Sequence, residues 1–401
     1  MVKINKALIS GSLILLITFN IYNYFNFIFH FFMVRMLSEA DYGILATLFS
    51  MLYMTGVFSE SIQTIITKYS ASEKNSGKLK NLFSRTIKKS LKISLIIFVV
   101  FAFVAIPLAS LLKIPYLLLT STGLMIFAAF LPPVTRGLLQ GTRRFKALGL
   151  NFIIESFVKL GLSILLVLIG WKVYGAIVAT VIAAIVAFVL SILALKKILK
   201  SKEKIMQTKG IYAYSWPVLF ILFNVMVFYS IDIIIAKIVF SDNIAGYYAI
   251  ASILAKTIFF ATQPISKALF PLSAEKKKSK DSQHLLVNAI GLVFLCILAS
   301  LTIFYFFPSL LIRIFSGKVI PESVNILFYL GIAFSLISLA NLIILYKLSL
   351  GRIRSYIIFI IFPIIEILVL FFFSNNLTEY SLALVTASAI FLWGSVLLFD
   401  K

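Results

Sequence analysis

Charged residues are scarce in this sequence. Of its 401 residues, 13% are charged and 61% are hydrophobic, and the mean hydropathy is +1.07. Soluble domains carry about 25% charged residues, so this composition excludes an ordinary soluble protein. No stretch is free enough of apolar runs to form a separate soluble domain. The composition therefore predicts an all-α polytopic membrane protein.

Cysteine and histidine are also rare. The single cysteine, Cys296, excludes a disulfide within the chain, and the two histidines, His30 and His284, are far apart. We therefore expect no histidine-based metal site and no cofactor. The sequence contains no Walker A, GxGxxG, HExxH, GxSxG or CxxC pattern, and no loop long enough for a catalytic domain. These absences argue against an enzyme.

Long apolar runs dominate what is present. Each is close to the roughly 20 residues that cross about 30 Å of hydrocarbon, and the first continues too far to be a cleaved signal peptide. We count twelve such segments, at about 10–34, 44–67, 90–112, 115–135, 147–169, 173–195, 212–238, 247–271, 285–308, 323–346, 355–374 and 380–399.

The net charge of +23 has a topological explanation. If the N-terminus is cytoplasmic, most Lys and Arg residues lie in or beside cytoplasmic segments. This asymmetry predicts a multi-pass protein of the cell (plasma) membrane with both termini in the cytoplasm. The basic runs 196–204 and 275–280 are then topology determinants that also contact anionic membrane lipids, so we expect no nucleic acid partner. The outer side keeps only Arg35, Lys113, Lys172, Arg313 and Lys318.

The chain contains an internal repeat. Residues 41–74 resemble residues 245–277, with Gly43 matching Gly246. Six predicted spans separate the two copies, and an even number preserves orientation. We therefore predict two six-helix bundles, 1–205 and 206–401, as parallel repeats related by a pseudo-twofold axis along the membrane normal.

Polar side chains recur on single faces of several predicted spans. Such faces must meet one another or water, because an unsatisfied polar group in lipid costs several kcal/mol. A lysine near the bilayer centre alone costs roughly 2.5–3.5 kcal/mol. These faces include Asn23 on span 1, Glu60 and Gln63 on span 2, Glu155 and Lys159 on span 5, Asp232 on span 7, and Ser252, Lys256 and Gln263 on span 8.

These sites have different alternative explanations. Glu155 and Lys159 fit a self-satisfied ion pair as well as a substrate site. Lys237 and Arg35, near the outer ends of their spans, fit snorkelling to the headgroups. Lys256 and Glu60 lie too deep for that, so a functional reading is favoured for both. Glu366, alone in span 11, fits either a protonated acid or a partner of a neighbouring span.

Four segments carry a family resemblance. "RMLSEADYGILA" (35–46), residues 136–170, "YSIDIIIAK" (229–237) and "AGYYAIASILAKTIFF" (245–260) resemble the polysaccharide transporters, the O-antigen-type flippases of the multidrug/oligosaccharidyl-lipid/polysaccharide superfamily. The resemblance implies a V-shaped pair of bundles with spans 1, 2, 7 and 8 around a cavity. It also implies a cationic cavity for a polyprenyl-linked sugar phosphate, matched here by Lys256 and by Lys159, Lys237 and Arg35.

The leading hypothesis is a flippase that moves a polyprenyl-(pyro)phosphate-linked oligosaccharide from the cytoplasmic to the outer leaflet by alternating access. The alternative is a cation-coupled exporter of drugs or small molecules on the same fold. A glycan polymerase or ligase is disfavoured, because the longest outer connection, about 309–322, is short. We expect a monomer that contacts such a polymerase or ligase functionally. The substrate-binding candidates are Lys256, Lys159, Lys237, Arg35, Asn23, Gln63, Gln263 and Ser252, and the ion-coupling candidates are Glu60, Asp232, Glu155 and Glu366.

Overall fold

All regular secondary structure in the described part of the chain is helical. In the computed structural model, residues 6–207, 215–275, 280–351 and 356–397 are described, and they contain no strand. Nine helices in this part are long and apolar enough to cross a membrane, and Ile357–Phe372 is a shorter apolar helix. The range Phe145–Ala194 contains two successive helices of 22 and 23 residues, each long enough to be a span of its own. With α1 (Lys6–Met36) added, the helices follow the twelve predicted segments, and the all-α polytopic fold is confirmed.

Contacts divide the described residues into two compact units. Unit 1 takes the residues up to Leu37 and Thr55–Ser215, whereas unit 2 takes Ser38–Met54 and the residues from Trp216 onward. Helix α2 (Glu39–Ala71) is continuous, so its first half belongs to unit 2 and its second half to unit 1. These units are defined by packing, whereas the predicted halves 1–205 and 206–401 are defined by sequence repetition. The units therefore do not test the halves, which stay a prediction. The chain termini lie outside the described residues.

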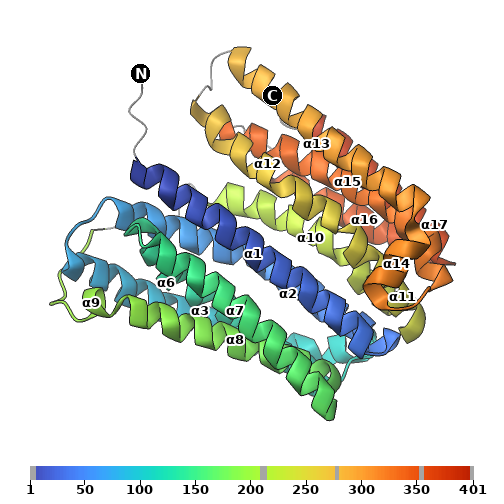
Figure 1. The fold of residues 1–401 in the computed structure, drawn as a ribbon, viewed down its shortest axis with the longest axis horizontal. Helices are drawn as coiled ribbons and strands as arrows, with labels where there is room; N and C mark the ends of the chain where they lie inside the picture. The colour runs from blue at the N-terminus through green and yellow to red at the C-terminus, as the bar shows by residue number, and fades with distance from the viewer. Residues whose placement is uncertain (1–5, 208–214, 276–279, 352–355, 398–401) are drawn as a thin grey trace. The chain divides into compact units, whose positions relative to one another are not determined.

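Unit 1 is built around α7. This helix packs against α1 on one side and α8 on the other (Figure 1). Gly170, with φ of +93°, provides the left-handed turn from α7 towards α8. The elements of unit 1 after α2 are α3 (Ser76–Leu112), α4 (Tyr116–Gly123), α5 (Met125–Phe130), α6 (Pro132–Gly141), α7 (Phe145–Leu166), η1 (Val167–Trp171), α8 (Lys172–Ala194) and α9 (Lys196–Leu199).

Unit 2 is built around α15, which packs against α11, α12, α13 and α17 (Figure 1). Pro321 is the first residue of α15, a position at which the missing backbone N–H of proline is tolerated. A single residue, Lys256, separates α11 from α12. The elements are α10 (Ser215–Val239), α11 (Asp242–Ala255), α12 (Thr257–Glu275), α13 (Lys280–Phe306), α14 (Pro308–Ser316), α15 (Pro321–Ser349), η2 (Tyr356–Ile360), α16 (Ile361–Phe372) and α17 (Leu377–Leu397).

The two glycines matched in the sequence repeat lie against each other inside unit 2. A Cβ on Gly43 would lie 3.0 Å from the Gly246 Cα atom, and a Cβ on Gly246 would lie 2.1 Å from the Glu39 carbonyl oxygen. Only glycine allows backbones to approach this closely. The starts of α2 and α11 are therefore packed backbone to backbone.

Two helices present mainly apolar side chains to the outside. In the most apolar windows of α3 and α13, 11% and 17% of residues are buried. Phe103 on α3 and Leu295 on α13 are among their exposed large side chains. Apolar exposure on this scale fits contact with lipid tails, whereas α15 is 67% buried over its window and forms the core of unit 2.

Candidate functional site

Asp232 lies at the centre of a buried polar cluster in unit 2. The Oδ2 atom of Asp232, on α10, accepts hydrogen bonds from the Tyr248 hydroxyl (3.0 Å) and the Ser252 hydroxyl (2.7 Å). The Lys256 ammonium donates to Oδ1 at 2.8 Å. The three donors are four residues apart along α11 and its end, so they share one helix face. This spacing gives a fully buried carboxylate three side-chain donors.

The Lys256 ammonium is held from two directions. Only 2% of Lys256 is exposed, and besides Asp232 its Nζ faces the rings of Tyr229 and Phe334 at 4.9 and 5.2 Å from their centroids. Aromatic faces attract cations, and the attraction is strongest where water is excluded. The ion pair is therefore enclosed by α10, the α11–α12 junction and α15.

Glu366 on α16 adds a second carboxyl group to this cluster. It is fully buried, and among the described residues neither of its carboxyl oxygens has a hydrogen-bond partner. It interacts electrostatically with both Asp232 and Lys256. An ionised carboxylate without a partner costs several kcal/mol in such surroundings, so a bound proton or metal cation would stabilise it.

Tyr380 on α17 closes the cluster. Its hydroxyl donates to the backbone carbonyl of Asp232 at 2.6 Å, and its ring packs edge-on against Tyr248 at 5.0 Å between centroids. Five segments therefore contribute side chains to this cluster: α10, α11, α15, α16 and α17. A change in the charge of this cluster would therefore alter the interactions of all five segments.

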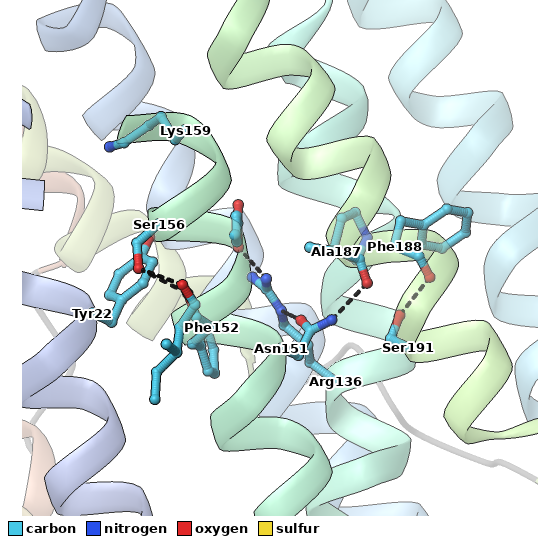
Figure 2. Close-up of polar contacts among 12 residues, drawn as sticks. Tyr22, Arg136, Asn151, Phe152, Ser156, Lys159, Ala187, Phe188 and Ser191 are labelled. Carbon is cyan, nitrogen blue, oxygen red and sulfur yellow. Dashed lines mark hydrogen bonds and ion pairs between the residues drawn. The ribbon is translucent and has the colours of Figure 1, made fainter. Parts of the chain in front are cut away.

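Unit 1 contains a second buried network, centred on Arg136 of α6 (Figure 2). Its Nε donates to the Asn151 side chain at 2.8 Å, and its other end pairs with Glu155. The guanidinium also lies 4.2 Å from the Phe152 ring centroid. Asn151 donates in turn to the Ala187 carbonyl oxygen at 2.6 Å. The network therefore ties α6, α7 and α8 together.

Lys159 lies on the same face of α7 as Asn151 and Glu155, one helical turn after Glu155. Figure 2 shows its ammonium pointing away from Arg136. It donates to the Asn26 side chain of α1 and lies 4.5 Å from the Phe29 ring centroid. Glu155 pairs with Arg136 of α6, whereas Lys159 bonds to Asn26 of α1, so these two side chains of α7 contact different helices. Asn151, Glu155 and Lys159 repeat in unit 1 the four-residue spacing of Tyr248, Ser252 and Lys256 in unit 2.

The structure brings together some of the sequence candidates and separates others. Asp232, Ser252, Lys256 and Glu366 form one group. Lys237 is buried and pairs with Asp242 at the start of α11, outside that group. Gln63 donates to Gln140 at 2.8 Å within unit 1. The remaining candidates lie elsewhere: Glu155 and Lys159 in the Arg136 region, Arg35, Asn23 and Glu60 exposed, and Gln263 half-buried. Their functional roles all stay predictions.

Two residues of these networks were missed as candidates. Arg136 is not among the sequence candidates, and it lies close in sequence to two further arginines, Arg143 and Arg144. The sequence signal available for Arg136 was its place near the start of α6, three residues after the two prolines that begin that helix. Tyr380 stands in an apolar stretch where a single tyrosine is ordinary, and no sequence pattern marks it.

The overall fold has counterparts among solved structures. An inward-facing multidrug resistance MATE family transporter of the MOP superfamily matches 94% of this chain and 93% of its own, with 13% identity and a TM-score of 0.76. The lipid II flippase MurJ, in an inward closed conformation, matches 96% of this chain and 88% of its own, with 16% identity and a TM-score of 0.71. At such identities the similarity shows the fold.

The fold is the one shared by these two membrane proteins, a transporter of the MOP superfamily and a lipid II flippase. The family model described as polysaccharide biosynthesis protein matches residues 32–325, and the chain belongs to that family. A membrane protein of Methanocaldococcus jannaschii is 26% identical over 354 residues, 83% of each chain. The predicted superfamily and the prediction of a transporter are confirmed.

Proposed function

We propose that this protein translocates a polyprenyl-(pyro)phosphate-linked oligosaccharide from the cytoplasmic to the outer leaflet of the cell membrane. Membership of the polysaccharide biosynthesis family supports a glycan substrate, and the fold shared with the lipid II flippase MurJ supports a lipid-linked one. Both termini are cytoplasmic in this proposal, and the protein acts as a monomer in functional contact with a glycan polymerase or ligase.

The observation that carries the proposal is the Lys256–Asp232 pair beside Glu366. One buried lysine stands against two buried carboxyl groups, and one of these has no hydrogen-bond partner among the described residues. A cation or proton taken up by the two carboxyl groups reduces their attraction for the Lys256 ammonium. The ammonium is then available to the substrate phosphate, because charge-assisted hydrogen bonds are strong where water is excluded.

Alternating access links this exchange to transport. A bound ligand shifts a conformational equilibrium only through a difference in its affinity for the two states. In this proposal, the state with Lys256 held by Asp232 is free of substrate, and the state with Lys256 released binds the phosphate. Asn and Gln side chains such as Asn23, Gln63 and Gln263 replace the hydration of the sugar, and Lys159, Lys237 and Arg35 supply further positive charge.

A second candidate function is a cation-coupled exporter of small amphipathic compounds. The similarity in fold to the multidrug resistance MATE family transporter favours it, and so does the buried carboxyl pair, which suits a coupling cation. In this case Asp232 and Glu366 are the coupling site, with Glu60 and Glu155 as further acidic candidates.

One experiment separates the two functions. Proteoliposomes receive either a fluorescent polyprenyl-pyrophosphate glycan, followed by its accessibility in each leaflet, or a cationic dye, followed by efflux. Protein-free liposomes are the control. We expect the glycan lipid to change leaflets at least tenfold faster with protein than without, and the dye to stay. Dye efflux without movement of the glycan lipid would replace the flippase proposal with the exporter.

A further inference from the structure

A basic pocket lies at the end of α8 in unit 1, apart from both buried networks. Its volume is about 490 Å³, and no acidic side chain is among its lining residues in the described chain. A concave surface with four cationic groups is suited to an anion. The lining residues are Arg144, Leu193, Ala194, Lys196, Lys197 and Lys200.

The backbone fixes the position of Arg144. Arg143 adopts a left-handed conformation with φ of +59°, which turns the chain between α6 and α7. The Arg144 backbone N–H then donates to the Leu139 carbonyl oxygen at 2.8 Å, and its guanidinium donates to the Ala194 carbonyl oxygen at 2.5 Å. A guanidinium has five N–H donors, so this bond orients the group and leaves donors for a ligand.

An apolar track leads away from the pocket along α8. Ile182, Ile185, Val189 and Leu193 are all exposed, and their spacing of three or four residues places them on one helix face. Leu193 belongs both to this track and to the pocket lining. A soluble anion would use only the basic part, whereas a lipid with an anionic headgroup contacts both parts.

We propose that this pocket binds the phosphate headgroup of a membrane lipid, whose chain lies along the exposed face of α8. The leaflet concerned is the one that we predict to be cytoplasmic. Two sources share this chemistry: an anionic phospholipid of the membrane, and a polyprenyl phosphate. The inference does not depend on the proposed transport function, because it concerns binding alone.

The test compares two pairs of exposed lysines with equal spacing. Lys196→Gln/Lys200→Gln removes two charges from the pocket, and Lys88→Gln/Lys92→Gln removes two exposed charges from α3. Purified protein is titrated with phosphatidylglycerol, a short-chain polyprenyl phosphate, phosphatidylcholine or inorganic phosphate, and bound lipid is counted by native mass spectrometry. Thermal unfolding confirms that both variants are folded.

We expect the pocket variant to lose about tenfold or more in affinity for at least one of the two phosphate lipids, and the α3 variant to lose less than about threefold. The lipid with the larger loss identifies the source. Equal losses in the two variants, or no loss in either, would overturn the proposal. So would inorganic phosphate that binds as tightly as the lipids, because the apolar track would then have no role.

Discussion

The Lys256 ammonium donates a 2.8 Å hydrogen bond to Asp232, and both side chains are buried within unit 2. Burying two charges costs several kcal/mol for each, and a single ion pair rarely recovers that cost in full. A helix that only had to span the membrane would be more stable with apolar residues at both positions. We therefore interpret this pair as a functional element.

Removal of the Asp232 charge tests this ion pair. Asp232→Asn leaves the Lys256 ammonium buried without its counter-ion, so we expect a loss of about 3–5 kcal/mol in the free energy of unfolding. The double variant Asp232→Asn/Lys256→Met should recover a large part of that loss. Thermal and denaturant unfolding in detergent measure both effects. A single variant as stable as the wild type would contradict the buried pair.

Glu366→Gln tests the carboxyl group that has no hydrogen-bond partner among the described residues. An amide keeps the shape of the side chain but neither binds a proton nor balances a metal cation. We expect the variant to fold and its transport rate to lose its dependence on pH or Na⁺. The exposed Glu322→Gln is the matched control. A Glu366→Gln protein with the wild-type ion response would exclude Glu366 as the coupling site.

The close contact between Gly43 and Gly246 predicts that an added methyl group destabilises the protein at Gly246 but not at a glycine with open space around it. Gly246→Ala places a Cβ 2.1 Å from the Glu39 carbonyl oxygen, so one backbone must shift, at a cost of roughly 1–3 kcal/mol. Gly291→Ala, with nothing within 4 Å of its added Cβ, should be neutral or stabilising by up to about 1 kcal/mol. Unfolding of the two variants side by side decides this. Equal stabilities would show that the two helices are not in backbone contact.

The loop before α3 predicts a pH effect on stability. The backbone N–H of Asn75, and after it the Lys78 ammonium, hold the pKa of Glu73 below its ordinary value of 4.5. A carboxyl group with a lowered pKa in the folded state stabilises the fold above that ordinary value, and the contribution is lost as the pH falls through the lowered value.

Glu73→Gln should therefore lower the melting temperature at neutral pH. The difference from the wild type should shrink as the pH falls below 4.5. Melting curves across this range measure the effect, and Glu322→Gln is the control for a general loss of acidic charge. A difference that grows on acidification would have the wrong sign for this explanation.

The sequence predicted the fold better than the site. The length of each apolar run is set by bilayer thickness, so the order of the helices could be derived locally. The shared face of Ser252 and Lys256 also followed from helical spacing. Their common acceptor, Asp232, lies on another helix, and the rotation of one helix against its neighbour is determined by packing over the whole unit.

The same limitation explains the alternatives left open at Glu155. Its spacing from Lys159 suggested a local ion pair; the two groups do interact electrostatically, and Glu155 forms an ion pair with Arg136. Arg136 comes from a different helix, and the tight turn with Arg143 in a left-handed conformation lies between them. Local spacing limits which residues share a face, but it does not decide between partners on the same helix and partners on another.

The most direct test of the proposed function is the rate at which Lys256→Met transfers a fluorescent polyprenyl-pyrophosphate glycan between the leaflets of proteoliposomes. The control is Lys347→Met, which removes another buried lysine of unit 2, one that donates to the Val396 carbonyl oxygen. We expect the Lys256 variant to fold and to flip the glycan lipid at least tenfold more slowly than the Lys347 variant. Equal rates for the two folded variants would contradict a role for Lys256 in binding the phosphate.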